Sequence, residues 1–249
     1  MHLHTKALVL RETAYKESDK ILTLLTQEQG KLTASARGCR RKGSPLAAGS
    51  QLLVWSDFIL YEYQGRWSVK EAEVEREFRG MREDLDKFSL GCYFGEVTQA
   101  LALEGLPSPE MLSLILNSLH ALDRLDRPLA LVKGAFELRA MCLAGYEPVL
   151  DAYAVCGCQP EEPRFHLREG VLHCARCRGE VGDGVSMPLD QGALAAMRHV
   201  AYGDPKRLFS FQLEEKSLSA FADVAEAYLL TQLERGFSTL DFYKSLRLS

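Results

Sequence analysis

Four cysteines gather within 22 residues of this 249-residue chain, in two closely spaced pairs. Cys156 and Cys158 form the first pair, Cys174 and Cys177 form the second, and a polar spacer rich in Pro, Glu and Arg separates them. Four thiolates can close a tetrahedral zinc site, and a metal would hold together a segment too polar to fold by burial alone. We therefore expect residues 153–180 to form a zinc-knuckle-like insertion with zinc as a structural cofactor.

The fourth ligand of this site is open. One residue separates Cys156 from Cys158, which is tighter than the usual Cys-x-x-Cys, and Tyr153 stands where a standard first ligand would lie. Cys158 is the expected fourth ligand, His166 and His173 are alternatives, and loss of the metal is another. Disulfides are less favoured, because the N-terminus resembles no signal peptide and seven cysteines are an odd number.

A small zinc- or thiol-dependent enzyme is the alternative function for these residues. It would need an open zinc position or a reactive cysteine beside a base. Cys174 follows His173 directly, but adjacent residues seldom face each other productively. Four thiolates leave no position for a reacting water. We expect a structural site and no enzymatic step.

A second cluster could bind phosphate. Arg37, Arg40, Arg41 and Lys42 place four cations within six positions, flanked by Gly38 and Gly43. Long cationic side chains on a loop neutralise phosphates without reading bases. Lys31 would extend this basic surface. The alternative is a solvated cationic loop that has no partner.

Aromatic residues follow this loop and have two interpretations. They could stack on unpaired bases, or they could fill the interior of a small barrel, which is the commoner role. The residues are Trp55, Phe58, Tyr61, Tyr63 and Trp67.

The secondary structure expected to position these clusters changes from strands to helices along the chain. Five short β-leaning runs, separated by turn residues, predict a small closed barrel of the OB type over residues 1–80. They are Leu3–Leu10, Lys20–Thr26, Lys31–Arg37, Gln51–Tyr63 and Arg66–Ala72.

Helical periodicity then predicts an α-helical domain over residues 81–249, which carries the cysteine insertion. In the first helix an apolar stripe is expected from Leu85 through Phe88 to Val97. The expected helices are Asp84–Leu103, Pro109–Leu125, Pro128–Leu143, Asp190–Tyr202, Lys216–Arg235 and Thr239–Leu246. The fold class is α+β and multidomain.

Charge differs between the two regions. Residues 1–80 hold 13 of the 30 basic and 10 of the 34 acidic residues, a net charge of +3, whereas the whole chain carries −4. No apolar stretch approaches the roughly 20 residues of a membrane span, so a cytoplasmic protein is expected. A sequence-specific regulator would need a recognition helix rich in Arg, Asn or Gln, and none of the expected helices shows that composition.

The order of several stretches resembles the RecO family of bacterial recombination mediators, and the resemblance covers nearly the whole chain. The stretches are Tyr15–Ile21, Gly30-Lys31 before a strand, Ala36–Gly38 with its basic loop, Phe78–Leu85, Gly145–Pro148 and the cysteine insertion.

This resemblance implies a DNA repair protein that binds single- and double-stranded DNA, anneals complementary strands and helps to load recombinase. It implies RecR and the acidic C-terminal tail of single-stranded-DNA-binding protein as partners, and a cytoplasmic, nucleoid-associated location. The basic loop would contact phosphates, and Cys156, Cys174 and Cys177 would fall on three of the family's four cysteine positions. Basic candidates for contact with the tail are Arg124, Arg127, Lys133 and Arg139.

Overall fold

The computed structural model describes residues 1–158, 162–174, 176–177 and 180–247. The chain forms two compact units. Unit 1 comprises residues 1–124 together with 237–249, and unit 2 comprises residues 125–236. Unit 1 is therefore built from both ends of the chain.

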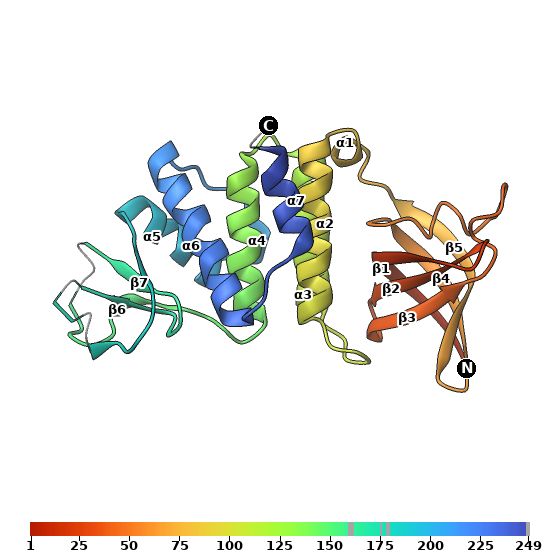
Figure 1. The fold of residues 1–249 in the computed structure, drawn as a ribbon, viewed down its shortest axis with the longest axis horizontal. Helices are drawn as coiled ribbons and strands as arrows, with labels where there is room; N and C mark the ends of the chain where they lie inside the picture. Colours follow the sequence, from red (N-terminus) through yellow and green to blue (C-terminus); the bar gives the residue numbers. More distant parts are fainter. Residues whose placement is uncertain (159–161, 175, 178–179, 248–249) are drawn as a thin grey trace. The chain divides into compact units, whose positions relative to one another are not determined.

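A closed five-stranded barrel forms the N-terminal part of unit 1 (Figure 1). Its strand order is β1-β2-β3-β5-β4, in which β3 and β5 pair in parallel and the other neighbours are antiparallel. This confirms the predicted OB-type barrel. The strands are β1 (His2–Tyr15), β2 (Asp19–Thr26), β3 (Gly30–Ala36), β4 (Trp55–Tyr63) and β5 (Arg66–Arg76).

The barrel follows from alternation along its strands. Leu22 and Leu24 of β2, and Phe58 and Leu60 of β4, are buried in one apolar core, while the residues between them face outward. A period of two places every second side chain on the inner face of a sheet. β4 begins later than predicted, because residues 51–53 form a turn.

Three helices follow the barrel, and the C-terminal helix joins them in unit 1. The Asp84 carboxylate accepts the Lys87 N–H at 3.0 Å and so caps α2. The C-terminal helix α7 packs against α2, where Glu96 accepts the Thr239 N–H at 3.1 Å. The helices are α1 (Arg79–Arg82), α2 (Leu85–Leu101), α3 (Pro109–Arg124) and α7 (Ser238–Leu246).

One part of the predicted α2 stripe is wrong. Leu85 is 60% exposed, although it was expected on the buried face. Small residues explain the difference, because Gly91 and Gly95 lie on the buried face, where Leu53 packs close to both positions. Spacing of large apolar residues alone overlooks such a face.

In the described residues of unit 2, three helices combine with a small sheet. Helices α4 and α6 pack together, and α5 packs against both. The sheet has the order β6-β8-β7-β9. The elements are α4 (Leu129–Leu143), β6 (Val149–Tyr153), β7 (Arg164–His166), β8 (Val171–His173), β9 (Ser186–Pro188), α5 (Gln191–Tyr202), the 3-10 turn η2 (Pro205–Arg207) and α6 (Glu215–Leu233).

The helices of the described residues include none that combines the length and apolar character needed to cross a membrane.

The start of β3 is fastened to the segment that follows α2 within unit 1. The Lys31 N–H donates to the Leu103 carbonyl at 3.2 Å, and the Gly105 N–H donates to the Lys31 carbonyl at 3.2 Å. Gly30 has φ +59°, and a Cβ added there would collide with the backbone of Leu106. Only glycine fits both the left-handed conformation and this close approach.

We expect Gly30→Ala to lower the free energy of unfolding of the barrel by about 3 kcal/mol or more, because a backbone collision adds to conformational strain. Gly65→Ala is the matched control. Gly65 also has positive φ (+71°), but its Cβ position is open, so a loss of about 1 kcal/mol is expected. Trp55 and Trp67 are the chain's two tryptophans and both lie in the barrel, so their fluorescence during denaturation reports on it. Equal losses in the two variants would contradict the close approach.

Candidate nucleic-acid interface and metal centre

The basic loop, residues 37–44, leaves the barrel at the end of β3. Cys39 is 2% exposed and belongs to the barrel core, while Arg37, Arg40, Arg41 and Lys42 are all exposed. The buried thiol side chain thus anchors the middle of the loop, and the cations remain in solvent. Burial raises the pKa of the Cys39 thiol, so it stays neutral.

The turn between β1 and β2 holds this loop in place. An Asp19 carboxylate oxygen accepts the Gly38 N–H at 2.8 Å, and the Ser18 carbonyl accepts the Arg40 N–H at 2.9 Å. The hydrogen bond from the Gly38 N–H is the main cause of the lowered pKa of the Asp19 carboxyl. The Ser18 hydroxyl and the nearby charges of Lys16 and Arg41 lower this pKa further. Asp19 is therefore ionised at neutral pH and fixes the loop backbone.

The two segments enclose a surface hollow of about 540 Å³. Lys16 contributes a third cation beside Arg37 and Arg41, and Glu17 and Asp19 contribute two carboxylates; Ser18 and Gly38 complete the lining. Guanidinium and ammonium groups around a hollow of this kind suit a phosphate. Lys16 and Asp19 are not among the site residues predicted from the sequence, although both belong to the stretch Tyr15–Ile21.

Lys31 lies at the other end of β3 from the basic loop. Its Nζ donates to the Gln99 carbonyl at 2.8 Å, in the last turn of α2. A lysine there satisfies a carbonyl that has no partner within the helix. The structure does not bring Lys31 together with the other basic residues, and its role in DNA binding stays a prediction.

The aromatic residues are divided between core and surface. Phe58 is fully buried, and Trp67 packs against the barrel core. Trp55 and Tyr61 are half-buried, whereas Tyr63 is 62% exposed. Phe58 and Trp67 thus belong to the barrel interior, and base stacking by the more exposed rings stays a prediction.

Three of the basic candidates on the helices already have partners. Lys133 is buried, and its Nζ lies 2.8 Å from both a Glu137 and a Glu226 oxygen. Burial lowers the pKa of Lys133, but the two carboxylates more than offset this and raise it. Arg139 donates to the Ala201 carbonyl at 2.8 Å, and Arg124 pairs with Asp123 at 2.8 Å.

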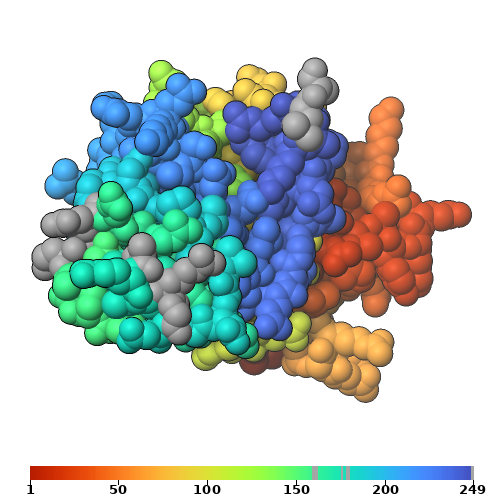
Figure 2. Space-filling model, turned by 60° about the vertical axis from the view of Figure 1, so that its left-hand side comes forward, coloured from red at the N-terminus to blue at the C-terminus, as the bar shows by residue number. Residues whose placement is uncertain are grey.

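The cysteine cluster forms where two parallel strands end. β6 and β8 are parallel neighbours, so their carboxyl ends lie at the same edge of the sheet. Cys174 follows β8 directly, Cys156 follows β6, and a turn from Cys174 brings Cys177 back. The three sulfur atoms lie within 4.8 Å of one another. This segment, coloured green to cyan, lies at the surface of unit 2 (Figure 2).

The thiols in this cluster differ in acidity. A hydrogen bond from the Cys177 N–H is the main cause that lowers the pKa of the Cys174 thiol, to about 7. The hydrogen bond between the two side chains is the main cause that raises the pKa of the Cys177 thiol, to about 12. The hydrogen bonds to Cys174 therefore favour its thiolate form. Three thiolates can hold a metal ion, and soft sulfur ligands suit zinc.

Cys158 lies outside this group of three. It is exposed, and its Sγ contacts the Cys156 carbonyl at 3.7 Å. Tyr153 is buried, and its N–H donates to the Cys158 carbonyl at 3.1 Å, so its backbone shapes the turn that carries the first cysteine pair. Cys158 as fourth ligand stays a prediction.

The two histidines considered as ligands are buried in the sheet. His173 uses both ring nitrogens, toward the Cys174 carbonyl at 2.9 Å and the Ser186 hydroxyl at 2.8 Å. His166 accepts the Glu169 N–H at 3.1 Å through Nδ1, and its Nε2 has no hydrogen-bond partner among the described residues. Neither histidine joins the group of three sulfurs found among the described residues.

Comparisons with known proteins cover both units. A family model described as "Recombination protein O N terminal" matches residues 1–78, and one described as "Recombination protein O C terminal" matches residues 82–241. A DNA repair protein RecO of Acetivibrio thermocellus is 32% identical over 248 residues, which cover 98% of this chain and 97% of the relative. Proteins of the same name from Symbiobacterium thermophilum (31% identical, 96% of each chain) and Alkaliphilus metalliredigens (28% identical, 99% of this chain and all of the relative) are also similar.

These matches run through the barrel, the helices and the cysteine segment in the order in which the chain presents them. The protein belongs to the RecO family of DNA repair proteins.

Proposed function

We propose that this protein is a recombination mediator that binds single- and double-stranded DNA through the basic loop and anneals complementary strands. The observation that supports this most directly is the hollow between the basic loop and the β1–β2 turn, where Lys16, Arg37 and Arg41 converge. Arg40 and Lys42 extend the positive surface beside it.

Annealing makes a specific physical demand on such a protein. Two strands that repel each other must be neutralised while their bases stay free to pair. Cations on a loop contact phosphates without reading bases, and so act equally on every sequence. The anchoring of the loop by Cys39 and Asp19 reduces the entropy that it would otherwise lose on binding.

The partners that we propose are RecR and the acidic C-terminal tail of single-stranded-DNA-binding protein. With them the protein would help to load recombinase onto coated DNA at the bacterial nucleoid. Because Lys133, Arg139 and Arg124 have partners of their own, Arg127 is the basic candidate left for the tail among these four.

We propose zinc as a structural cofactor of unit 2. Cys156, Cys174 and Cys177 would supply three thiolates, and Cys158, two residues from Cys156, would supply the fourth by a change of rotamer and loop conformation. The metal would join the ends of β6 and β8, which are paired in register at two positions.

The proposed function is tested by annealing of complementary strands coated with single-stranded-DNA-binding protein. The wild type should anneal them rapidly, and replacement of Arg40, Arg41 and Lys42 by Ala should abolish most of this activity. The same variant should reduce the slope of log affinity against log salt by roughly 2 to 3, because about three phosphate contacts are lost.

Replacement of Lys206, Arg207 and Lys216 by Ala removes the same charge from exposed positions of unit 2 and serves as the control. An unchanged salt slope in the loop variant would move the DNA site elsewhere. Failure of the wild type to bind or anneal would contradict the proposed function.

Asp19 allows a test of positioning against charge. We expect Asp19→Ala to weaken DNA binding about three- to tenfold, although it removes a negative charge, because the loop loses its anchor at Gly38. Glu17→Ala removes the other carboxylate of the hollow and should strengthen binding through charge alone. Titration with a fluorescent oligonucleotide measures both. Stronger binding by Asp19→Ala would show that charge dominates.

The metal is tested by the composition of the purified protein. We expect one zinc ion per chain, measured by atomic absorption, and its loss together with a lower melting temperature when Cys174 and Cys177 are replaced by Ser. Cys142→Ser, a half-buried thiol of α4, controls for loss of a cysteine as such. Wild-type protein that contains no zinc would end the metal proposal.

A further inference from the structure

The outer face of the β4–β5 hairpin combines aromatic rings with cations. Tyr61 and Tyr63 are two residues apart on β4, and both lie on the side opposite the buried Phe58 and Leu60. Arg66 is paired with Tyr63 in register and is exposed. The charge on this face is therefore positive where the rings lie.

The ring of Tyr61 is held between two neighbours. The His2 ring of β1 lies 4.9 Å from it, centroid to centroid, and the Lys70 ammonium lies 5.3 Å from its centroid. Because Lys70 is on β5 and His2 is on β1, this cluster spans three strands. A tyrosine fixed in this way loses little freedom when a second ring stacks on it.

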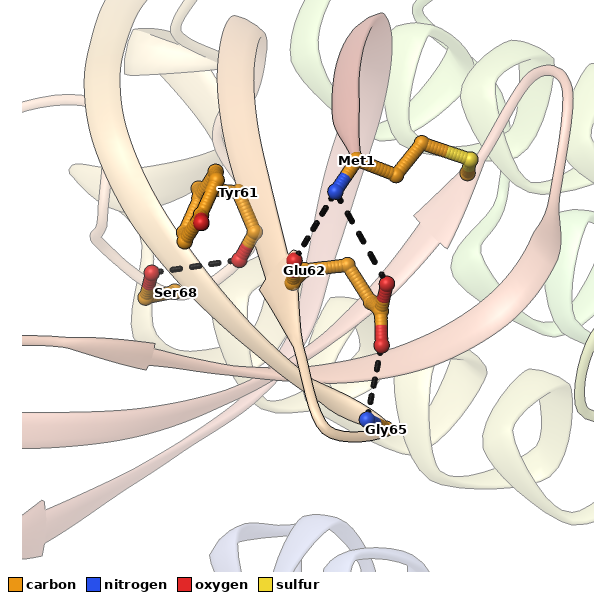
Figure 3. Close-up of polar contacts among 5 residues, drawn as sticks. All are labelled: Met1, Tyr61, Glu62, Gly65 and Ser68. Carbon is orange, nitrogen blue, oxygen red and sulfur yellow. Dashed lines mark hydrogen bonds and ion pairs between the residues drawn. The ribbon is translucent and has the colours of Figure 1, made fainter.

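The backbone below these side chains is fastened. Figure 3 shows the contacts: the Tyr61 carbonyl accepts the Ser68 hydroxyl at 3.2 Å, and the Glu62 carboxylate accepts the Gly65 N–H at 2.7 Å. The Met1 amine donates to the Glu62 carbonyl at 2.9 Å. Glu62 is thus engaged at the turn, and its charge faces the amine rather than the tyrosine rings.

A row of registered pairs connects this face to β3. Ser35 pairs with Ser68, Ser68 with Tyr61, and Tyr61 with His2, so that the row crosses four strands. At about 4.8 Å per strand, it extends roughly 14 Å. β3 and β5 run parallel, so the chain continues from Ser35 to Arg37 in the direction in which β5 continues from Ser68 to Lys70. The basic loop therefore begins at the Lys70 side of this face, and Tyr63 lies at the other side, next to the hairpin turn.

Acidic residues mark where the positive face ends. Beyond Lys70, β5 carries Glu71, Glu73 and Glu75, all of them exposed. A polyanion that passes from the basic loop to Lys70 would be repelled by these carboxylates and directed toward the half of the face near the hairpin turn. The aromatic rings lie on this half.

We propose that His2, Tyr61, Tyr63, Arg66 and Lys70 form a stacking platform for unpaired bases of single-stranded DNA, separate from the phosphate contacts of the basic loop. The proposal rests on the proposed function, since the loop delivers the strand. Aromatic faces accept every base, and the neighbouring cations balance the phosphates. The platform is open, so a stacked base can leave it to pair with a complementary strand.

Full-length protein and two 20-nucleotide probes test the platform by fluorescence anisotropy. One probe is oligothymidylate, and the other is an abasic strand of the same length and charge. We expect the wild type to prefer the thymidylate by roughly tenfold, as one or two stacked bases would give. Tyr61→Leu should bring the two affinities to within about twofold, whereas Tyr61→Phe, which keeps the ring, should retain the preference.

Tyr63→Leu is a second variant at a more exposed position, and it should reduce the preference without affecting folding. Affinity for duplex DNA should stay unchanged in all three variants. Equal affinity of the wild type for the two probes would overturn the platform while leaving DNA binding by the loop intact. The proposed function itself would fail if the wild type bound neither probe.

Discussion

Closure of the barrel through parallel pairing of β3 with β5 is the constraint on which the rest of unit 1 depends. Only Ala34 with Trp67 and Ser35 with Ser68 make this contact in register. It places the end of β3 beside the start of β5, so the loop after β3 emerges next to the β4–β5 hairpin. Without closure, the basic loop and the tyrosines would lie on opposite edges of an open sheet.

The same principle acts in unit 2 on a smaller scale. Parallel β6 and β8 end at one edge, and this is why cysteines 18 positions apart, Cys156 and Cys174, come within reach of one ion. In each unit, the candidate site residues follow a strand that has a parallel neighbour, at the point where the chain leaves the sheet. The side chains themselves come from loops, whereas their spacing comes from the strands.

Much of this arrangement follows from local patterns. β-leaning runs such as Lys20–Thr26 predict the barrel strands, and helical periodicity predicts the helices, although β1 extends to Tyr15, beyond its predicted end at Leu10. The sheet of unit 2 escapes such reasoning, because β7, β8 and β9 have three residues each and show no period. The role of Asp19 also escapes it, because its partner Gly38 lies 19 positions away and the contact requires the β2–β3 pairing to exist first. The residue types in a segment predict what kind of ligand it could bind. Pairing between distant strands decides which of these residues come together in one site.

The composition of unit 1 from both ends of the chain has a consequence for synthesis. Helix α7, which packs against α2, is translated only after all of unit 2. After the barrel and α2 have been synthesised, the ribosome must add more than a hundred further residues before α7 can pack on that face of α2. During this interval the nascent chain exposes apolar surface that is a target for chaperones. A premature stop codon anywhere in unit 2 would also remove α7 from unit 1, so the truncated polypeptide would leave that face of α2 uncovered.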